Sequence, residues 1–118
     1  MRKRLALAAM AATLSTTAAA ANIEYKDGAI CDRKSGFCVD HQGVSVAITK
    51  MYLGDAAEAR LMAEINKVGI QDFDAGSFTM RGGLTCKVAE KTCWTSKYSG
   101  KVDAKATRVL FGKPAARP

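Results

Sequence analysis

Four cysteines, arranged as two pairs of identical spacing, constrain this chain more than any other feature. Six residues separate the members of each pair, and a glycine stands three places before the first cysteine of each pair; the pairs are Cys31 with Cys38 and Cys86 with Cys93. Ligands of zinc ribbons come in closer pairs, typically about two residues apart. The spacing therefore favours two disulfide bonds over a metal site, and it marks the only internal repeat of the sequence.

Each repeat is predicted to be a β-hairpin. In an antiparallel pair with a short turn, residues seven apart can face each other with Cβ atoms about 4.5–5.5 Å apart, close to the ~3.8 Å of a disulfide. Lys34-Ser35-Gly36 is a good turn for the first hairpin, whereas Val88-Ala89-Glu90-Lys91 is a poorer one for the second. Local bonds, Cys31–Cys38 and Cys86–Cys93, are favoured. Two hairpins packed about a pseudo-twofold axis would instead bridge Cys31 to Cys86 and Cys38 to Cys93, or the swapped partners, and the sequence leaves these alternatives open.

Residues 1–21 have the pattern of a secretory signal peptide. A basic start leads into an apolar run from Leu5 to Leu14 and then to four alanines that end at Ala21. The run is too short for a membrane span, which needs about 20 apolar residues. We therefore expect cleavage near Ala21 and a periplasmic or secreted protein, in which an even number of cysteines forms disulfides. Residues 22–112 are expected to form a single domain, followed by a disordered basic tail at 113–118.

The positive charge is concentrated at the C-terminal end. Removal of the signal lowers the net charge from +7 to +4, and residues 22–100 hold ten basic and ten acidic side chains, so the excess lies in 101–118. A nucleic-acid partner is disfavoured, because export separates the protein from it and no basic face is interleaved with aromatics. A solubilising basic end is the simplest interpretation. An anionic envelope ligand is the functional one, with four candidate surface contacts: Lys97, Tyr98, Lys101 and Arg108.

The segment between the cysteine pairs carries the main helical signal. Gly43–Ile48 is predicted as a short strand and Lys50–Leu53, after Thr49, as one helical turn that Gly54 stops. Asp55, with Glu58 three places on, is predicted to cap a helix over 56–68 that ends at Gly69. A stripe of apolar residues is expected to face a sheet: Ala57, Leu61, Ile65 and Val68.

The C-terminal half is predicted to be a three-strand meander and a short helix. Ser77–Met80, Leu84–Val88 and Thr92–Trp94 are the expected strands, with a turn at Arg81-Gly82-Gly83. The helix is expected over 104–111 under an Asp103 cap, with Val109, Leu110 and Phe111 packing on the domain. The predicted fold class is therefore a small disulfide-stabilised α+β domain, in which antiparallel hairpins and a meander pack against one main helix.

Several segments together resemble the YcgJ-like family, also called Fels prophage protein-like. They are Cys31-Asp32, Gly36-Phe37-Cys38-Val39-Asp40, Gly43-Val44-Ser45, Thr49-Lys50-Met51-Tyr52-Leu53-Gly54 with Ala56-Ala57, Phe78-Thr79, Gly83-Leu84-Thr85-Cys86 and Glu90-Lys91-Thr92-Cys93. The similarity covers Ile30 to Phe111 and departs from the family at Arg81-Gly82-Gly83, where an Asn-Gly-type turn is expected. It implies a small exported, prophage-related bacterial protein, and it supplies no catalytic residues, because the family has no established activity.

The sequence contains no complete catalytic or metal-binding pattern. His41 is the only histidine and stands in a turn context, so a nucleophile–histidine–acid triad would depend on it alone. Asp72 and Asp74 lack the further ligands of a calcium loop. The Cys-x-x-Cys spacing of thiol oxidoreductases is absent. We therefore predict no enzymatic activity, no cofactor and no metal.

Two classes of function remain. The preferred one is a non-enzymatic exported binding or structural protein whose disulfide-linked hairpins present a rigid surface to an unknown protein or an anionic envelope ligand. The alternative is a periplasmic inhibitor of a cell-wall hydrolase such as lysozyme, because Ser96-Lys97-Tyr98-Ser99-Gly100 faintly resembles the loops of such inhibitors. Charge opposes this alternative, since lysozymes are usually basic and Lys97 and Lys101 accompany the loop.

Overall fold

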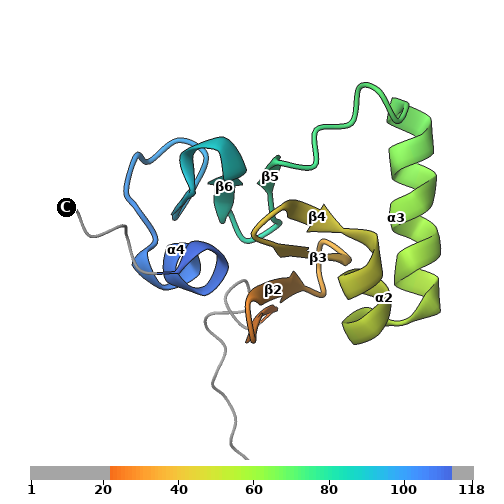
Figure 1. Cartoon of the computed structure of the whole chain (residues 1–118), viewed down its shortest axis with the longest axis horizontal. Coiled ribbons are helices and arrows are strands. Elements are labelled where there is room, and N and C mark those ends of the chain that lie inside the picture. Colours follow the sequence, from red (N-terminus) through yellow and green to blue (C-terminus); the bar gives the residue numbers. More distant parts are fainter. Residues whose placement is uncertain (1–21, 113–118) are drawn as a thin grey trace, which may run out of the picture.

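The structure, a computed structural model, describes residues 22–112. The expected signal peptide at 1–21 and the expected basic tail at 113–118 lie outside the described residues. Within the described part the fold is α+β, as predicted, with two antiparallel sheets and three α-helices (Figure 1).

The first sheet contains the first cysteine pair. Its strands follow in chain order: β1 (Ile23–Lys26), β2 (Ala29–Asp32), β3 (Phe37–Asp40) and β4 (Gly43–Ser45). The predicted hairpin is confirmed, because β2 and β3 are antiparallel and Cys31 lies directly opposite Cys38. Gly36, with a φ of 86°, allows the turn between them. Strand β1, which pairs with β2, is an element that the sequence analysis does not predict.

The second sheet is the predicted three-strand meander, in which the first two strands are shorter than expected and the third has the predicted bounds. It contains β5 (Ser77–Thr79), β6 (Thr85–Lys87) and β7 (Thr92–Trp94). The Arg81-Gly82-Gly83 turn is closed by the N–H of Gly83, which donates to the carbonyl of Met80. Between β6 and β7 a 3-10 turn, η1 (Val88–Glu90), is followed by Lys91 in the left-handed region at φ 48°. The 3-10 turn and the left-handed conformation of Lys91 therefore connect the two strands of the second hairpin, although its turn residues are unfavourable.

Helix α2 (Val46–Leu53) corrects the prediction of a strand over 43–48. The strand ends at Ser45, whose hydroxyl accepts a hydrogen bond from the N–H of Ile48 and so caps the helix. Capping by a side-chain oxygen satisfies an N–H group that the first helical turn leaves without a partner, which outweighs the β-propensity of Val46 and Ile48.

Helix α3 (Asp55–Val68) starts one residue before the predicted range, and two details of the prediction are wrong. The N-cap is Gly54 rather than Asp55, and no side chain caps the helix. Ala57, Leu61 and Ile65 are buried as predicted, but Val68 is 50% exposed because it is the last helical residue. Moreover α3 packs mainly against α2, which lies between it and the first sheet, so the longest helix covers a helix more than a sheet (Figure 1).

Helix α4 (Ala104–Phe111) has the predicted bounds. The carboxylate of Asp103 accepts a hydrogen bond from the N–H of Ala106, which confirms the predicted cap. Leu110 is buried and Val109 and Phe111 pack partly against the core. The helix contacts β7 and also β1 and β2, so it joins the two sheets.

The core is shared by both sheets and α4. Ile30 and Val39 come from the first sheet, Phe78 and Leu84 come from the second sheet and the turn before β6, and Leu110 comes from α4. All four cysteines are fully buried. A single core therefore spans both halves of the repeat, which is consistent with one domain.

The two sheets meet where β4 passes the segment before β5. The N–H of Val44 donates to the carbonyl of Ala75, and a Cβ added at Gly43 would lie 2.0 Å from that carbonyl oxygen. Gly43 also has a φ of 108°. Only glycine fits both the backbone conformation and this close approach.

Candidate functional site

The two disulfides have the favoured local connectivity. Cys31 is bonded to Cys38 and Cys86 to Cys93, and the Cα atoms of each pair are 4.0 Å apart. Each bond joins residues that face each other across one hairpin. The crossed alternatives are therefore wrong for this structure, and each half of the repeat is closed on itself.

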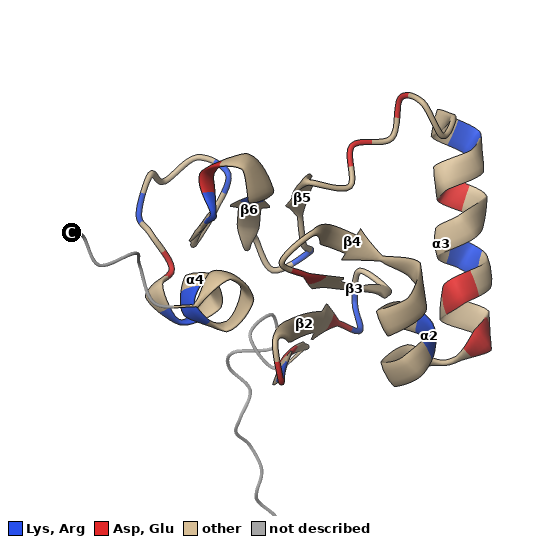
Figure 2. Cartoon of the chain, in the orientation of Figure 1, with Lys and Arg blue, Asp and Glu red and all other residues tan. Residues whose placement is uncertain are grey.

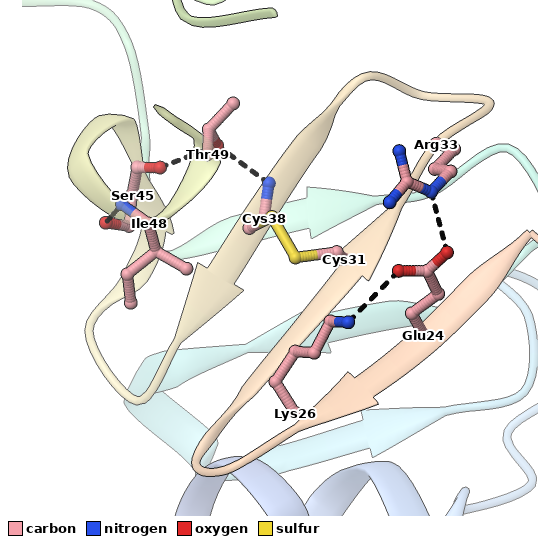
Figure 3. The surroundings of a disulfide bond; sticks show 8 residues. All are labelled: Glu24, Lys26, Cys31, Arg33, Cys38, Ser45, Ile48 and Thr49. Atoms are coloured by element: carbon pink, nitrogen blue, oxygen red, sulfur yellow. Dashed lines mark hydrogen bonds and ion pairs between the residues drawn. A yellow bond between two sulfur atoms is a disulfide. The ribbon is translucent and has the colours of Figure 1, made fainter. Parts of the chain in front are cut away.

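A threonine from the helix that follows each hairpin binds the backbone of the second cysteine. Thr49 of α2 accepts a hydrogen bond from the N–H of Cys38 at 2.8 Å (Figure 3). Thr107 of α4 accepts one from the N–H of Cys93 at 2.9 Å. The repeat seen in the sequence as two cysteine pairs thus extends to the helices, although the threonines stand at different spacings from their cysteines.

Asp32 is a fully buried carboxylate that links the two sheets. It accepts hydrogen bonds from the N–H of Lys34 at 3.0 Å, from the hydroxyl of Ser35 at 2.5 Å and from the N–H of Arg81 at 3.1 Å. These donors satisfy a group that would be costly to bury alone. The arrangement holds the first hairpin turn against the turn after β5, so its role is structural.

His41 lies exposed in the turn between β3 and β4. It borders a depression of about 320 Å³ together with Val88, Lys91, Leu110 and Phe111. None of these neighbours carries a hydroxyl or thiol that the imidazole would activate. Among residues 22–112 there is also no group of three or more histidine, cysteine, aspartate or glutamate side chains placed to hold a metal ion.

A depression of the described surface lies on the outer face of the second sheet. Cys86 and Cys93 point into the core, so alternate residues of the same strands point the other way. This cleft has a volume of about 550 Å³, within the range of about 300–1,000 Å³ typical of small-molecule sites. The side chains that define it are Ser77, Thr79, Thr85, Lys87, Trp94 and Lys97.

Trp94 is the only tryptophan of the chain, and it lines this cleft. It is not among the side chains that pack against the core. Large aromatic side chains normally supply much of the buried area of a small core. Placing the tryptophan on the opposite face of the sheet therefore leaves its ring partly available to a ligand.

A tightly bonded loop, Thr95–Lys101, forms one rim of the cleft; we call it the Tyr98 loop. The N–H of Thr95 donates to the carbonyl of Lys101 and closes the loop at 2.9 Å. The hydroxyl of Ser96 accepts hydrogen bonds from the N–H groups of Tyr98 and Ser99. Tyr98 is nonetheless 90% exposed. The loop is thus ordered by its own serines while its aromatic side chain remains free.

The predicted surface contacts fall into two places. Lys97, Tyr98 and Lys101 belong to the Tyr98 loop, and Lys97 also lines the cleft. Arg108 is exposed on α4 and does not line the cleft. Sequence reasoning missed Trp94 and Lys87 as site residues. The available signal was the alternation along β6 and β7, which places both on the face opposite the buried cysteines.

Charged side chains elsewhere are mostly balanced. Acidic and basic residues are mixed along α3, which begins with two acidic residues and continues with a basic, an acidic and a basic one (Figure 2). On the first sheet Glu24 bonds to Arg33 at 2.7 Å and lies 3.3 Å from the Nζ of Lys26 (Figure 3). The hydrogen bond from Arg33, and then that from Lys26, lower the pKa of the Glu24 carboxyl from its ordinary value.

Tyr25 contributes an aromatic contact with a cation. The Nζ of Lys105 lies 4.1 Å from the centre of the Tyr25 ring, within the range of a cation–π interaction. Burial, and secondarily the charge of Asp103, raise the pKa of the Tyr25 hydroxyl. These contacts attach α4 to the edge strand β1 and occupy Lys105 in the fold.

The fold and the cleft define a class: a small α+β protein with two disulfide-linked hairpins and an open, polar depression beside a rigid loop. The disulfides are compatible with an exported protein. No helix within residues 22–112 has both the length and the apolar character needed to cross a bilayer.

The chain belongs to the YcgJ family, since the family model described as YcgJ protein matches residues 23–111. It is similar to the uncharacterized protein YcgJ of Escherichia coli (strain K12), with 33% identity over 91 residues that cover 71% of this chain and 68% of the relative. No solved structure matches the chain significantly. The predicted membership of the YcgJ-like family is thereby confirmed, and the family remains one without an established activity.

Proposed function

We propose that this protein is an exported, non-enzymatic binding protein of the periplasm or the extracellular medium, and that its ligand occupies the cleft on the second sheet. The observation that carries the proposal is the position of Trp94. Trp94 lies in a cleft and not among the core side chains, so core packing does not explain its position. It does provide a large contact area for a ligand.

The two disulfides support this role. The Cys86–Cys93 disulfide joins β6 and β7, the two strands that carry Thr85, Lys87 and Trp94. The strands that line the cleft are therefore covalently linked. A braced site loses less conformational entropy when it binds, which favours affinity without a large interface. The Tyr98 loop adds a rim that is ordered before binding.

Charge favours an anionic partner. Lys87 and Lys97 line the cleft with Glu90 as the single carboxylate, and Lys101 adds a further cation at the end of the Tyr98 loop. Lys97 has no ion-pair partner within residues 22–112. Together with Tyr98 and Arg108, these lysines are the proposed contacts to an envelope ligand or to an acidic protein.

Trp94 provides its own reporter for a binding test. Because it is the only tryptophan, its fluorescence emission reports on the cleft alone. We expect the addition of bacterial envelope fractions to shift or quench the emission of the full mature protein, and Lys97→Gln to weaken that response. Emission unchanged by sacculi, by anionic vesicles and by periplasmic extract would overturn the proposal.

Export has a separate test. Mass spectrometry of the protein purified from the periplasm of a bacterial host should find an N-terminus near Asn22. Recovery of the protein from the cytoplasm with residues before Ala20 intact would contradict export.

A second candidate function, inhibition of a cell-wall hydrolase such as lysozyme, is favoured by the Tyr98 loop. An ordered loop that presents an exposed aromatic side chain resembles a protein-binding hot spot. The lysines of the loop oppose binding to a basic hydrolase. A titration of lysozyme activity decides: loss of activity at stoichiometric protein, relieved by Tyr98→Ala, supports inhibition, and full activity at micromolar excess excludes it.

A further inference from the structure

The chemistry of the cleft defines its ligand more narrowly than its charge does. Its lining combines the ring of Trp94, a set of hydroxyl groups, two lysines and the carboxylate of Glu90; Phe78, the other aromatic lining residue, is only 7% exposed. A protein partner would be expected to meet an apolar centre with a polar rim. Here hydroxyl and ammonium groups share the lining with the aromatic side chain of Trp94.

The hydroxyl groups of the cleft have unused hydrogen-bonding capacity. Thr85 donates to the carbonyl of Gly83, so in its pair with Thr79 at 3.0 Å it accepts and Thr79 donates. Thr79 therefore still offers acceptor lone pairs to the cleft. Ser96 accepts two backbone N–H groups and retains its own O–H for donation.

Two further polar groups of the cleft have no partner within residues 22–112. They are the hydroxyl of Ser77 and the indole N–H of Trp94. The cleft thus offers donors and acceptors side by side. A polyol ligand presents the matching pattern, because every sugar hydroxyl is both a donor and an acceptor.

The ring and the lysines complete the match. The C–H face of a pyranose packs on an aromatic ring, which supplies the apolar part of such a contact. Lys97, which has no ion pair among the described residues, would pair with a carboxylate on the sugar. The Nζ of Lys87 lies 4.0 Å from a carboxylate oxygen of Glu90, so its charge is partly neutralised. Lys97 is therefore the cation that would interact more strongly with a carboxylate of the ligand.

We infer that the cleft of the second sheet binds an acidic saccharide, one sugar ring lying on Trp94 with its carboxylate on Lys97. This inference rests on the proposed binding function and names the chemical class of the ligand.

The test compares three probes of similar length by calorimetry on the mature, oxidised protein: a trimer of galacturonic acid, the neutral trimer cellotriose, and tri-glutamate. We expect the galacturonate trimer to bind about tenfold or more tightly than either of the others. Lys97→Gln should weaken it at least about threefold and make it less sensitive to salt. Ser77→Ala should weaken it by a similar factor, and Trp94→Phe should retain part of the affinity that Trp94→Ala loses.

The matched control is Lys67→Gln, because Lys67 is exposed on α3, makes no ion pair within residues 22–112 and lies outside the cleft. It should leave binding unchanged. Lys97 lies in an exposed loop, so its variant keeps the fold, which the melting temperature verifies.

The outcomes separate this inference from the proposed function. Equal binding of cellotriose would overturn the role of the carboxylate, and stronger binding of tri-glutamate would replace the saccharide by an acidic peptide. If all three probes fail while envelope fractions still change Trp94 emission, the inference is wrong and the binding function stands. If the envelope fractions also fail, both are wrong.

Discussion

The hydroxyl of Thr49 lies between the backbone N–H of Cys38 and the carbonyl of Ser45, accepting from the first at 2.8 Å and donating to the second at 2.7 Å (Figure 3). Cys38 and Ser45 are register partners on β3 and β4. At this position the chain leaves the sheet to start α2, and the threonine side chain replaces the direct ladder bond. The fully buried cysteine thus keeps a satisfied N–H group where the strand ends.

Removal of this hydroxyl should be costly. Thr49→Val keeps the shape of the side chain but leaves the buried N–H of Cys38 without its acceptor, a loss of about 1–3 kcal/mol in the free energy of unfolding. Urea denaturation measures it. Thr49→Ser is the control, since it retains the hydroxyl and should recover most of the stability; equal stability of Thr49→Val and the wild type would show that the bridge is dispensable.

The disulfide connectivity can be read from a tryptic digest of the unreduced protein. Cleavage after Arg33, Lys34, Lys87 and Lys91 separates the four cysteines into different peptides. We expect the peptide with Cys31 to be linked only to that with Cys38, and the peptide with Cys86 only to that with Cys93. A Cys31–Cys86 linkage would contradict the structure.

The same bonds should dominate stability. Each closes an eight-residue loop, which corresponds to roughly 2.5 kcal/mol in the chain-entropy estimate. Reduction should therefore lower the melting temperature markedly, and single removal of either pair by Cys→Ala should cost a similar amount. A melting curve unaffected by reductant would be inconsistent with this role.

Prediction from sequence was most accurate where a feature depends on local chemistry. The hairpin at Cys31–Cys38 follows from spacing and a Ser-Gly turn, and α4 follows from the Asp103 cap and its apolar residues. The predicted strand over 43–48 was wrong in its second half. A β-branched alternating run favours a strand, and the competing signal, Ser45 as a helix cap, depends on backbone geometry that the pattern alone does not reveal.

Tertiary contacts were the part that the sequence could not supply. In the sequence Asp32 has the pattern of an ordinary turn aspartate. In the structure it is fully buried and accepts a hydrogen bond from the N–H of Arg81, 49 residues away. Of the cleft residues, only Lys97 was predicted, from its charge. The sequence placed Trp94 in a strand but did not show which face of the sheet its side chain occupies. That face is determined by the burial of Cys93 on the opposite side.

The Asp32 contact gives a further prediction. Asp32→Asn replaces one acceptor oxygen by an NH₂ group that faces donors, so at least one of the three hydrogen bonds is lost at this buried position. We expect a loss of about 2 kcal/mol or more. Asp40→Asn is the matched control, because Asp40 accepts from the N–H of Gln42 in an exposed turn, and it should cost much less. Similar losses for both variants would refute a special role for Asp32.

Gly43 gives another prediction, with Gly28 as its control. Both have a positive φ, 108° and 73°, so alanine at either position is strained by about 1–2 kcal/mol. Only at Gly43 would the new Cβ also collide with the carbonyl oxygen of Ala75. Gly43→Ala should therefore destabilise the protein clearly more than Gly28→Ala in thermal unfolding. Equal melting temperatures would show that the contact between the sheets yields easily.

The last prediction concerns pH and Glu24. Its hydrogen bond with Arg33, and then that with Lys26, hold the pKa of the folded carboxyl below the ordinary 4.5. A folded pKa below the unfolded one means that the stabilisation is present above the ordinary pKa and is lost as the pH falls through the folded value. Glu24→Gln should therefore be less stable than the wild type near pH 7, and the difference should shrink towards about pH 3.

Urea denaturation at the two pH values checks this, and NMR titration of the Glu24 carboxyl gives the sign of the shift directly. Glu64→Gln serves as the comparison, because Glu64 is exposed on α3 and makes no ion pair within residues 22–112. Added salt should reduce the Glu24 effect near neutral pH, since Arg33 and Lys26 are partly exposed to solvent. A destabilisation by Glu24→Gln that is the same at both pH values would mean that the carboxylate acts through packing rather than through its charge.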